Sequence, residues 1–253
     1  MTGERLDDPL AEATRLVALA DSSGLAVRLI GGLAIEARVP GWKGGARSVA
    51  GRRDIDLATS RRDAAGVARL LGDVGYVADR HYNAIYGHKQ LYFMGPTNAR
   101  PIDVVIETLE MSHRLQFGPR LAADYPTLSL ADLLLSKLQI VHLNAKDALD
   151  AWVLLANFPL AEADREGINV RRLVEVTAHD WGWWRTVSGN LDRLLDPVTE
   201  RLPPALHDPV AQIRAIRSAI DQAPKSALWR LRARIGERVR WYDEPEEIGH
   251  EQP

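Results

Sequence analysis

RRDIDLATS, residues 52–60, is the stretch of this chain that decides its fold, because acidic and apolar side chains alternate along it. Alternation with a period of two is typical of a β-strand with one buried face, so Ile55 and Leu57 are expected to face a core. Residues two apart on a strand point to the same side. The pattern therefore predicts that Asp54 and Asp56 lie side by side on the opposite face.

Asp54 and Asp56 would form a pair of carboxylates that repel each other unless a cation neutralises them. Magnesium prefers oxygen ligands and usually binds proteins through one or two carboxylates together with substrate phosphates. A D-x-D pair also occurs in many strands that hold no metal. The metal interpretation therefore depends on what the rest of the chain places beside this pair.

A third acid, Asp103, lies inside the apolar stretch PIDVVI, residues 101–106. Every second residue from 102 to 106 is apolar and is expected on the buried face of a strand, which leaves Asp103 on the other face. An acid in so apolar a strand is unfavourable if it is buried without a partner. A metal ion or a nearby hydroxyl group would partner Asp103, and a strand-edge charge or a capped turn is the structural alternative.

The pattern along the chain predicts a mixed first half and a helical second half. Helices are expected over 9–22, 33–38 and 61–72, and strands over 26–30, 54–59, 76–79 running on to 87, 90–94 and 101–107. From Ser129 onward the pattern becomes almost wholly helical. The predicted fold class is therefore α+β, with a mixed sheet and flanking helices over residues 1–125, followed by a helical half over residues 126–253.

The helix expected over residues 129–143 carries a lysine on its apolar side. Ser129 and Asp132 have the spacing of a capping box. Lys137 falls on the same face as the leucines, where a lysine should find an anion or extend to an edge. We expect an anionic partner for it. Further on, Asn144 and Asp147 have the pattern of a helix start, and both capping and support of a site are open for Asp147.

The composition excludes several classes of protein. The chain contains no cysteine, so disulfides, thiolate zinc sites and cysteine nucleophiles are absent. No run approaches the roughly 18 apolar residues of a membrane span, and the N-terminus lacks the pattern of a secretory signal. We therefore expect a cytoplasmic protein that does not bind membranes. The formal net charge of −2 gives no general attraction to nucleic acid.

The C-terminal part is nevertheless basic, with six Lys or Arg residues against the single acid Glu237 between Lys225 and Tyr242. A buried stripe is expected here at Leu228, Leu231, Ile235, Val239 and Tyr242. The arginines are most simply a solvated face. The alternative is that they follow a polynucleotide backbone while Trp229 and Trp241 stack on bases.

The ordered combination of Gly31-Gly32, Asp54-Ile55-Asp56 and Asp103 resembles the nucleotidyltransferase superfamily. The segments IGGLAIEA (30–37), RRDIDLA (52–58) and RPIDVVIE (100–107) are similar to its AbiEii-like branch, which includes relatives of the MenT-type toxin nucleotidyltransferases. The resemblance extends over roughly residues 10–155. It implies a nucleotidyltransferase-fold catalytic domain in the first half and a helical domain that completes the cleft.

The resemblance also implies the roles of individual residues. Gly31 and Gly32 would let backbone amides approach a triphosphate, and glycine suits such a turn because it permits φ > 0. Asp54, Asp56 and Asp103 would hold Mg²⁺ or Mn²⁺, and Asp103 would also orient the acceptor hydroxyl.

Lys137, in the triplet Ser-Lys-Leu, would contact the triphosphate, as an AbiEii-like lysine does, and Asp147 belongs to the segment KDALD (146–150) that follows. The loop Pro40–Gly51 makes the Gly32-to-Asp54 connection longer than expected. Of the basic residues in or beside it (Lys43, Arg47, Arg52 and Arg53), we favour phosphate or acceptor contact only for Arg52 and Arg53, which directly precede the acids.

The predicted function is a metal-dependent nucleotidyltransferase that moves an NMP from a nucleoside triphosphate such as ATP to an acceptor hydroxyl. Its toxin-type relatives favour RNA, for example a tRNA 3′ end, as acceptor and a cognate antitoxin as partner. A small-molecule, antibiotic-type nucleotidyltransferase is the second hypothesis. A non-catalytic nucleotide-binding module is the third, and the intact set of three acids speaks against it.

Overall fold

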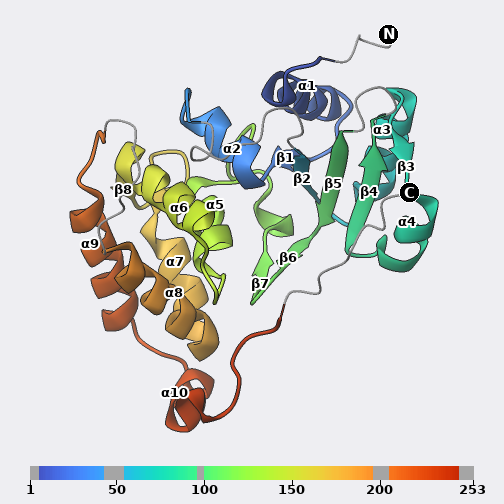
Figure 1. Cartoon of the computed structure of the whole chain (residues 1–253). Helices are drawn as coiled ribbons and strands as arrows, with labels where there is room; N and C mark the ends of the chain where they lie inside the picture. The colour runs from blue at the N-terminus through green and yellow to red at the C-terminus, as the bar shows by residue number, and fades with distance from the viewer. Residues whose placement is uncertain (1–5, 43–53, 96–99, 196–204, 245–253) are drawn as a thin grey trace.

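The computed structural model describes residues 6–42, 54–95, 100–195 and 205–244, and its centre is a five-stranded mixed sheet. The strands are β1 (Val27–Leu29), β2 (Ile55–Thr59), β3 (Val77–Ala78), β4 (Gln90–Met94) and β5 (Pro101–Ile106). They lie in the order β1-β2-β5-β4-β3, and β2 and β5 run parallel while the other neighbours are antiparallel. Figure 1 shows this sheet on one side of the molecule and a group of helices on the other.

The helices of the first half are α1 (Pro9–Ser22), α2 (Gly31–Arg38), α3 (Ala64–Asp73) and α4 (Arg80–Tyr86). The prediction for residues 9–22 is confirmed to the residue. The side chain of Asp8 caps this helix by accepting a hydrogen bond from the amide of Ala11 at 2.8 Å, and a proline occupies the first helical position.

The prediction of a strand running from Tyr76 to Gly87 is wrong beyond Ala78, where α4 begins instead. The side chain of Asp79 accepts a hydrogen bond from the amide of Tyr82 at 2.9 Å, which satisfies one of the free N–H groups at a helix start. Because of this cap the segment forms a helix, although the spacing of Tyr76, Tyr82 and Tyr86 is also compatible with a strand. The change turns Tyr82 into a buried side chain that packs back on β4.

The second half is built from α5 (Leu130–Leu138), α6 (Ala145–Asn157), α7 (Val170–His179), α8 (Trp181–Leu194), α9 (Pro209–Gln222) and α10 (Ala227–Ile235). Its helical character and the α+β fold class are confirmed. Short elements that the sequence pattern did not predict are β6 (Thr108–Glu110), β7 (Arg114–Gln116), η1 (Gly118–Arg120), β8 (Leu160–Ala161), β9 (Ile168–Asn169) and η2 (Gly236–Arg238). In the described segments, no helix has the length and apolar character that crossing a bilayer requires.

One continuous core joins the sheet to the helices. The same cluster of buried apolar side chains contains Ile35 of α2, Leu57 of β2, Leu134 of α5 and Ile216 of α9. Helix α2 lies at the junction, since it contacts α1, β2, α5 and α6. The domain boundary near residues 125–126 stays a prediction, because the buried apolar cluster spans both halves.

The expected buried stripe on the last helix is wrong. The side chains of Leu228, Leu231 and Ile235 on α10 are 77%, 58% and 42% exposed, and Val239 is also exposed. Helix α10 instead packs on the preceding helices through Trp229, whose ring meets that of Trp184 edge-on at 5.3 Å. A tryptophan buries more apolar area than a leucine, so it sets which side of this short helix faces the core.

Candidate active site

The structure brings Asp56 and Asp103 together as direct partners in the parallel pairing of β2 with β5. Both side chains are half-buried on the same face of the sheet, while their neighbours Ile55, Leu57 and Ile102 are buried on the other. Asp54 directly precedes β2 and is exposed. The alternation predicted for residues 54–59 is present only over 54–57, because Ala58 and Thr59 are both buried. The strand pairing nevertheless puts two acids from distant parts of the chain side by side.

Gly31 begins α2 against the Asp56 side chain. Its φ of +67° lies in the left-handed region, and a Cβ atom at this position would stand 2.2 Å from Asp56 Oδ2. The amide of Ile30 donates to the Asp56 carbonyl at 3.0 Å, so β1 and β2 fix this approach. Glycine is therefore required at position 31, because φ is positive and because the Asp56 carboxylate leaves no room for a Cβ atom. Gly32 follows in the first turn of the helix.

The electrostatics of Asp56 reflect this crowding. Burial, and then the negative charges of Asp103 and Asp54, raise the pKa of Asp56 to about 7. Lys137 and Lys146 of the helical half act in the opposite direction, so their charges reach this carboxylate. The set of acids thus favours an added positive charge, whether a proton or a metal ion.

Carboxylate oxygens are the donors that Mg²⁺ and Mn²⁺ prefer, so the residues fit a divalent cation in chemical type. In the part of the chain that the structure describes, no group of three His, Asp or Glu side chains is arranged to hold a metal ion. Magnesium usually needs only one or two carboxylates when phosphates and waters supply its other ligands. The Asp56–Asp103 pair offers that number.

Asp103 is held from its other side by β4. Gln90 Nε2 donates a hydrogen bond of 2.5 Å to Asp103 Oδ1, and Tyr92 is the direct β4 partner of Asp103. Burial, followed by the charge of Asp103, raises the pKa of Tyr82 to about 12, so the phenol of α4 also lies within the field of this acid. Gln90 and these two tyrosines were not identified from the sequence, because their relation to Asp103 depends on the pairing of β4 with β5.

Lys137 finds its anionic partner in the helical half. Its Nζ lies 2.7 Å from Asp147 Oδ1 and 3.0 Å from Asp150 Oδ2, and the residue is buried. Burial alone would lower the pKa of Lys137, but Asp150 and Asp147 outweigh it and raise the pKa. The inward-facing lysine read from helical spacing is thus paired with two carboxylates.

Asp147 and Asp150 hold that lysine from the first turns of α6. Asn144 caps α6, accepting from the Asp147 amide at 2.9 Å and donating to Asp147 Oδ2 at 2.7 Å. Asp150 is fully buried, and its Oδ1 accepts from Trp42 Nε1 at 3.1 Å. Asp147 therefore takes part in the cap of α6 and pairs with Lys137, while its role in an active site stays a prediction. Of the remaining predicted residues, Arg53 lies outside the described residues, as do Lys43, Arg47 and Arg52.

Replacing Gly31 with alanine tests the contact between α2 and Asp56. Gly24 provides a matched control, because its φ is +72° but a Cβ atom there would meet nothing within 4 Å. We expect Gly24→Ala to cost about 1–2 kcal/mol of unfolding free energy through its backbone alone. Gly31→Ala should cost more and should also displace the Asp56 carboxylate. Equal losses in urea unfolding for the two variants would contradict a close contact at Gly31.

Comparisons with known proteins find only a distant structural likeness. No protein-family model matches the chain, and no curated protein matches it. Among solved structures it is similar to the crystal structure of an antigenic nucleotidyltransferase-like protein from Paracoccidioides brasiliensis, at 13% sequence identity over 88% of this chain and 97% of that chain, with a TM-score of 0.39. A likeness this distant assigns neither a family nor an activity.

Proposed function

We propose that the protein is a metal-dependent nucleotidyltransferase that moves an NMP from a nucleoside triphosphate to an acceptor hydroxyl, releasing pyrophosphate. The observation that carries this proposal is the alignment of Asp56 with Asp103 on adjacent strands, directly beside the start of α2 at Gly31. Two carboxylates and a helix N-terminus at one point suit a cation and a phosphate together.

The acids would hold the divalent cation, with Asp54 and Asp56 as the first two ligands and Asp103 as the third. When bound, Mg²⁺ or Mn²⁺ would neutralise charge on the triphosphate oxygens. Asp103 would accept a hydrogen bond from the acceptor hydroxyl and so orient it. Gln90 would fix the carboxylate of Asp103, to which it already donates.

The phosphates would be bound by groups from both halves of the chain. The amides at the start of α2, at Gly31 and Gly32, have no acceptor within the helix and are suited to a phosphate oxygen. Lys137 has three N–H donors, of which Asp147 and Asp150 engage two within the described segments. The third would serve a β- or γ-phosphate oxygen, while the two aspartates keep the ammonium group in place.

RNA is the acceptor that we favour, with a cognate antitoxin as the corresponding protein partner. The basic stretch between residues 225 and 242 supports a polyanionic acceptor, and the overall charge of −2 weighs against it. A small-molecule hydroxyl is the second candidate acceptor. A binding module without turnover would not need all three acids, and all three are present.

A labelling experiment tests the activity. The protein is incubated with each α-³²P nucleoside triphosphate, Mg²⁺ and total RNA, beside Asp56→Ala and the exposed-acid control Asp73→Ala. We expect transfer of label to RNA by the wild type and by Asp73→Ala, and none by Asp56→Ala. Label on a small-molecule acceptor alone would reject RNA. The absence of both labelling and triphosphate binding would reject the enzymatic proposal.

A further inference from the structure

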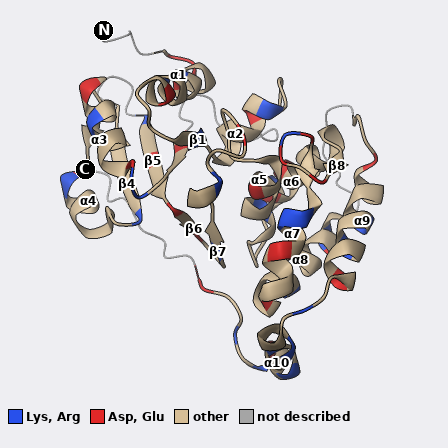
Figure 2. Cartoon of the chain, turned by 180° about the vertical axis from the view of Figure 1, so that it is seen from behind, with Lys and Arg blue, Asp and Glu red and all other residues tan. Residues whose placement is uncertain are grey.

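A pocket of about 590 Å³ lies between the start of α8, the helix α10, the segment after η2 and the residues that precede β7. Figures 1 and 2 both show α10 at the end of the molecule opposite α1 and α2. The lining contains none of the acids of the candidate active site. Its volume is within the range of about 300–1,000 Å³ that is typical of small-molecule sites.

Aromatic rings form much of the lining. Trp229, Trp241 and Tyr242 are half-buried, so each keeps part of its ring surface accessible. Trp241 meets Tyr242 edge-on at 5.4 Å and the buried Trp181 edge-on at 6.0 Å. Lys225 Nζ lies 5.5 Å from the centre of the Trp229 ring, and the guanidinium group of Arg185 lies 5.7 Å from that of Trp241. A planar aromatic ligand would therefore stack on the ring faces that these cations leave open.

Hydrogen bonds fix these walls in place. Thr186 Oγ1 lies 2.8 Å from His113 Nε2 and accepts from Trp241 Nε1 at 3.0 Å. Burial lowers the pKa of His113 to about 4, so its ring is neutral at pH 7 and stacks on Trp183 at 5.0 Å. Arg232 donates to the carbonyls of Gly236 and Val239 at 2.6 Å each. The pocket is therefore preformed.

The pocket carries charges of both signs, with one more arginine than aspartate in its lining. Arg114, Arg232 and Arg240 line it together with Asp180 and Asp243. Arg232 has a structural role, because its guanidinium group lies 4.7 Å over the ring of Trp181. Arg114 and Arg240 are exposed at the rim, where they pair with the carboxylates of Glu110 and Glu244. The guanidinium group of Arg240 also lies 4.8 Å from the centre of the Tyr242 ring, and a phosphate would compete with Glu244 for it.

Asp180 and Asp243 add hydrogen-bond acceptors to the pocket lining. Asp180 caps α8 through the Trp183 amide at 3.1 Å, and the backbone of Asp243 is held by the carbonyl of Ser112 at 3.0 Å. A carboxylate is an acceptor for amino or imino N–H groups. Flat rings, a rim arginine and carboxylates together match a ligand that has an aromatic heterocycle with N–H donors at one end and an anion at the other.

We propose that this pocket binds one nucleotide unit, with its base against Trp229, Trp241 and Tyr242 and its phosphate at Arg240. Helix α10 carries two further exposed arginines, Arg230 and Arg234, and its basic positions are blue in Figure 2. The unit is either a free mononucleotide or one residue of a single-stranded nucleic acid. The site does not rest on the proposed transferase activity.

Calorimetry in EDTA tests the site apart from the metal-dependent reaction. The full-length protein is titrated with each of the four ribonucleoside monophosphates and with a single-stranded pentanucleotide. We expect binding in EDTA, and Arg240→Ala should weaken it about tenfold. Arg238→Ala is the matched control, since Arg238 on η2 is also exposed but does not line the pocket. If the pentanucleotide binds much more tightly than the monophosphates, and its affinity falls with salt, the natural ligand is a single-stranded nucleic acid. If the two affinities are equal, the natural ligand is a free nucleotide.

¹⁹F NMR of protein labelled with 5-fluorotryptophan locates the ligand. The resonances of Trp229 and Trp241 should move on titration, while that of Trp42, which is bonded to Asp150 at the candidate active site, should not. If the wild type transfers no label from any triphosphate but the Trp229 and Trp241 resonances still move, the transferase proposal is refuted and the pocket proposal is not. The pocket assignment is overturned if no nucleotide or oligonucleotide binds, if Arg240→Ala binds like the wild type, or if only Trp42 responds.

Discussion

Replacing Asp56 with asparagine is expected to abolish nucleotidyl transfer and, in the metal-free protein at pH 8, to raise the free energy of unfolding. The pKa of Asp56 is about 7 in the fold, against an ordinary value of 3.8. Between these two pH values the folded state holds a proton that the unfolded state has released, so stability falls as the pH rises from about 4 to about 7. Above pH 7 Asp56 is ionised in the fold and the protein has lost this whole contribution to the free energy of unfolding. Asparagine has no charge at any pH, so the variant does not lose it.

The size of the gain follows from the pKa difference. A difference of about 3 units corresponds to about 4 kcal/mol, at 1.36 kcal/mol for each unit. We expect about 2 kcal/mol for Asp56→Asn at pH 8, because the side chain is only half-buried and water screens part of the repulsion. The gain should be smaller at pH 5, where the folded wild type still carries the proton.

Urea unfolding in EDTA at pH 5 and pH 8 measures this effect, with Asp73→Asn as the exposed control. The same variant should lose transfer by at least about 10²- to 10³-fold, as expected when a group that positions charge at the reaction centre is removed. A gain in stability together with a loss of activity is typical of a residue kept for function rather than for folding. Equal stability of variant and wild type at pH 8 would show that the pKa of Asp56 is not raised in the fold.

The residues of this site differ in how well the sequence predicts them. Alternation along residues 54–59 suffices to put Asp54 and Asp56 on one face, and helical spacing suffices to turn Lys137 inward, because both are properties of a single element. The pairing of Asp56 with Asp103 is a contact between strands that are not adjacent in sequence, and local patterns do not determine it. The same limit applies to Gln90, which reaches Asp103 only because β4 lies beside β5.

The helices show two other limits. The cap at Asp79 is a local signal that could have been used, since an aspartate just before a helix-compatible run is a common helix start. The apolar stripe of α10 has the correct spacing but is exposed, because the amphipathic pattern does not say which part of a short helix finds a partner. Asp132 was read as a helix-capping residue only, although its carboxylate is fully buried.

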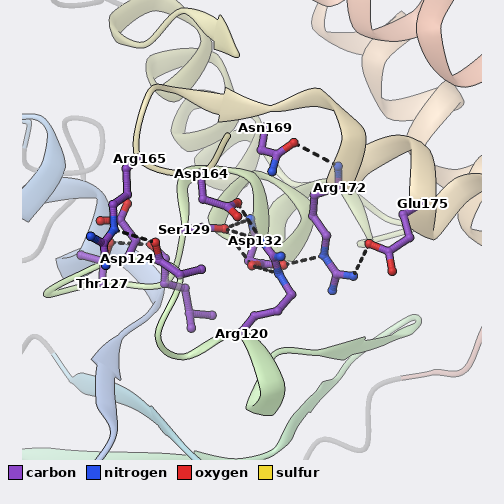
Figure 3. Close-up of polar contacts among 12 residues, drawn as sticks. Arg120, Asp124, Thr127, Ser129, Asp132, Asp164, Arg165, Asn169, Arg172 and Glu175 are labelled. Carbon is purple, nitrogen blue, oxygen red and sulfur yellow. Dashed lines mark hydrogen bonds and ion pairs between the residues drawn. The ribbon is translucent and has the colours of Figure 1, made fainter. Parts of the chain in front are cut away.

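Asp132 gives the second large effect, because replacing it with asparagine should destabilise the fold by about 3 kcal/mol. Its Oδ2 lies 2.8 Å from Arg120 Nε and its Oδ1 lies 2.9 Å from Arg172 Nε. Figure 3 shows the Asp132 side chain between these two arginines. Ser129 Oγ also donates to it at 2.7 Å. Asparagine keeps the shape of the side chain but leaves two guanidinium groups largely shielded from water without the charge that they enclose.

This cluster ties α5 to its surroundings. Arg120 of η1 also pairs with Asp164 at 2.7 Å, and Arg172 of α7 donates to the carbonyl of Gln116 at 2.8 Å. Asp132 therefore joins η1 and α7 directly to the helix that carries Lys137. We expect Asp132→Asn to lower transfer as well as stability, because the position of Lys137 relative to Asp56 depends on how α5 is held.

Glu175→Gln is the matched control for this variant. Glu175 pairs with the same Arg172 at 3.3 Å, but its side chain is 62% exposed, so its loss should cost less than about 0.5 kcal/mol. Urea unfolding at pH 7 compares the two variants directly. If Asp132→Asn were no less stable than Glu175→Gln, the buried ion pairs would not hold α5, and the position of Lys137 would depend on the packing of the α5 leucines in the core and on Asp147 and Asp150.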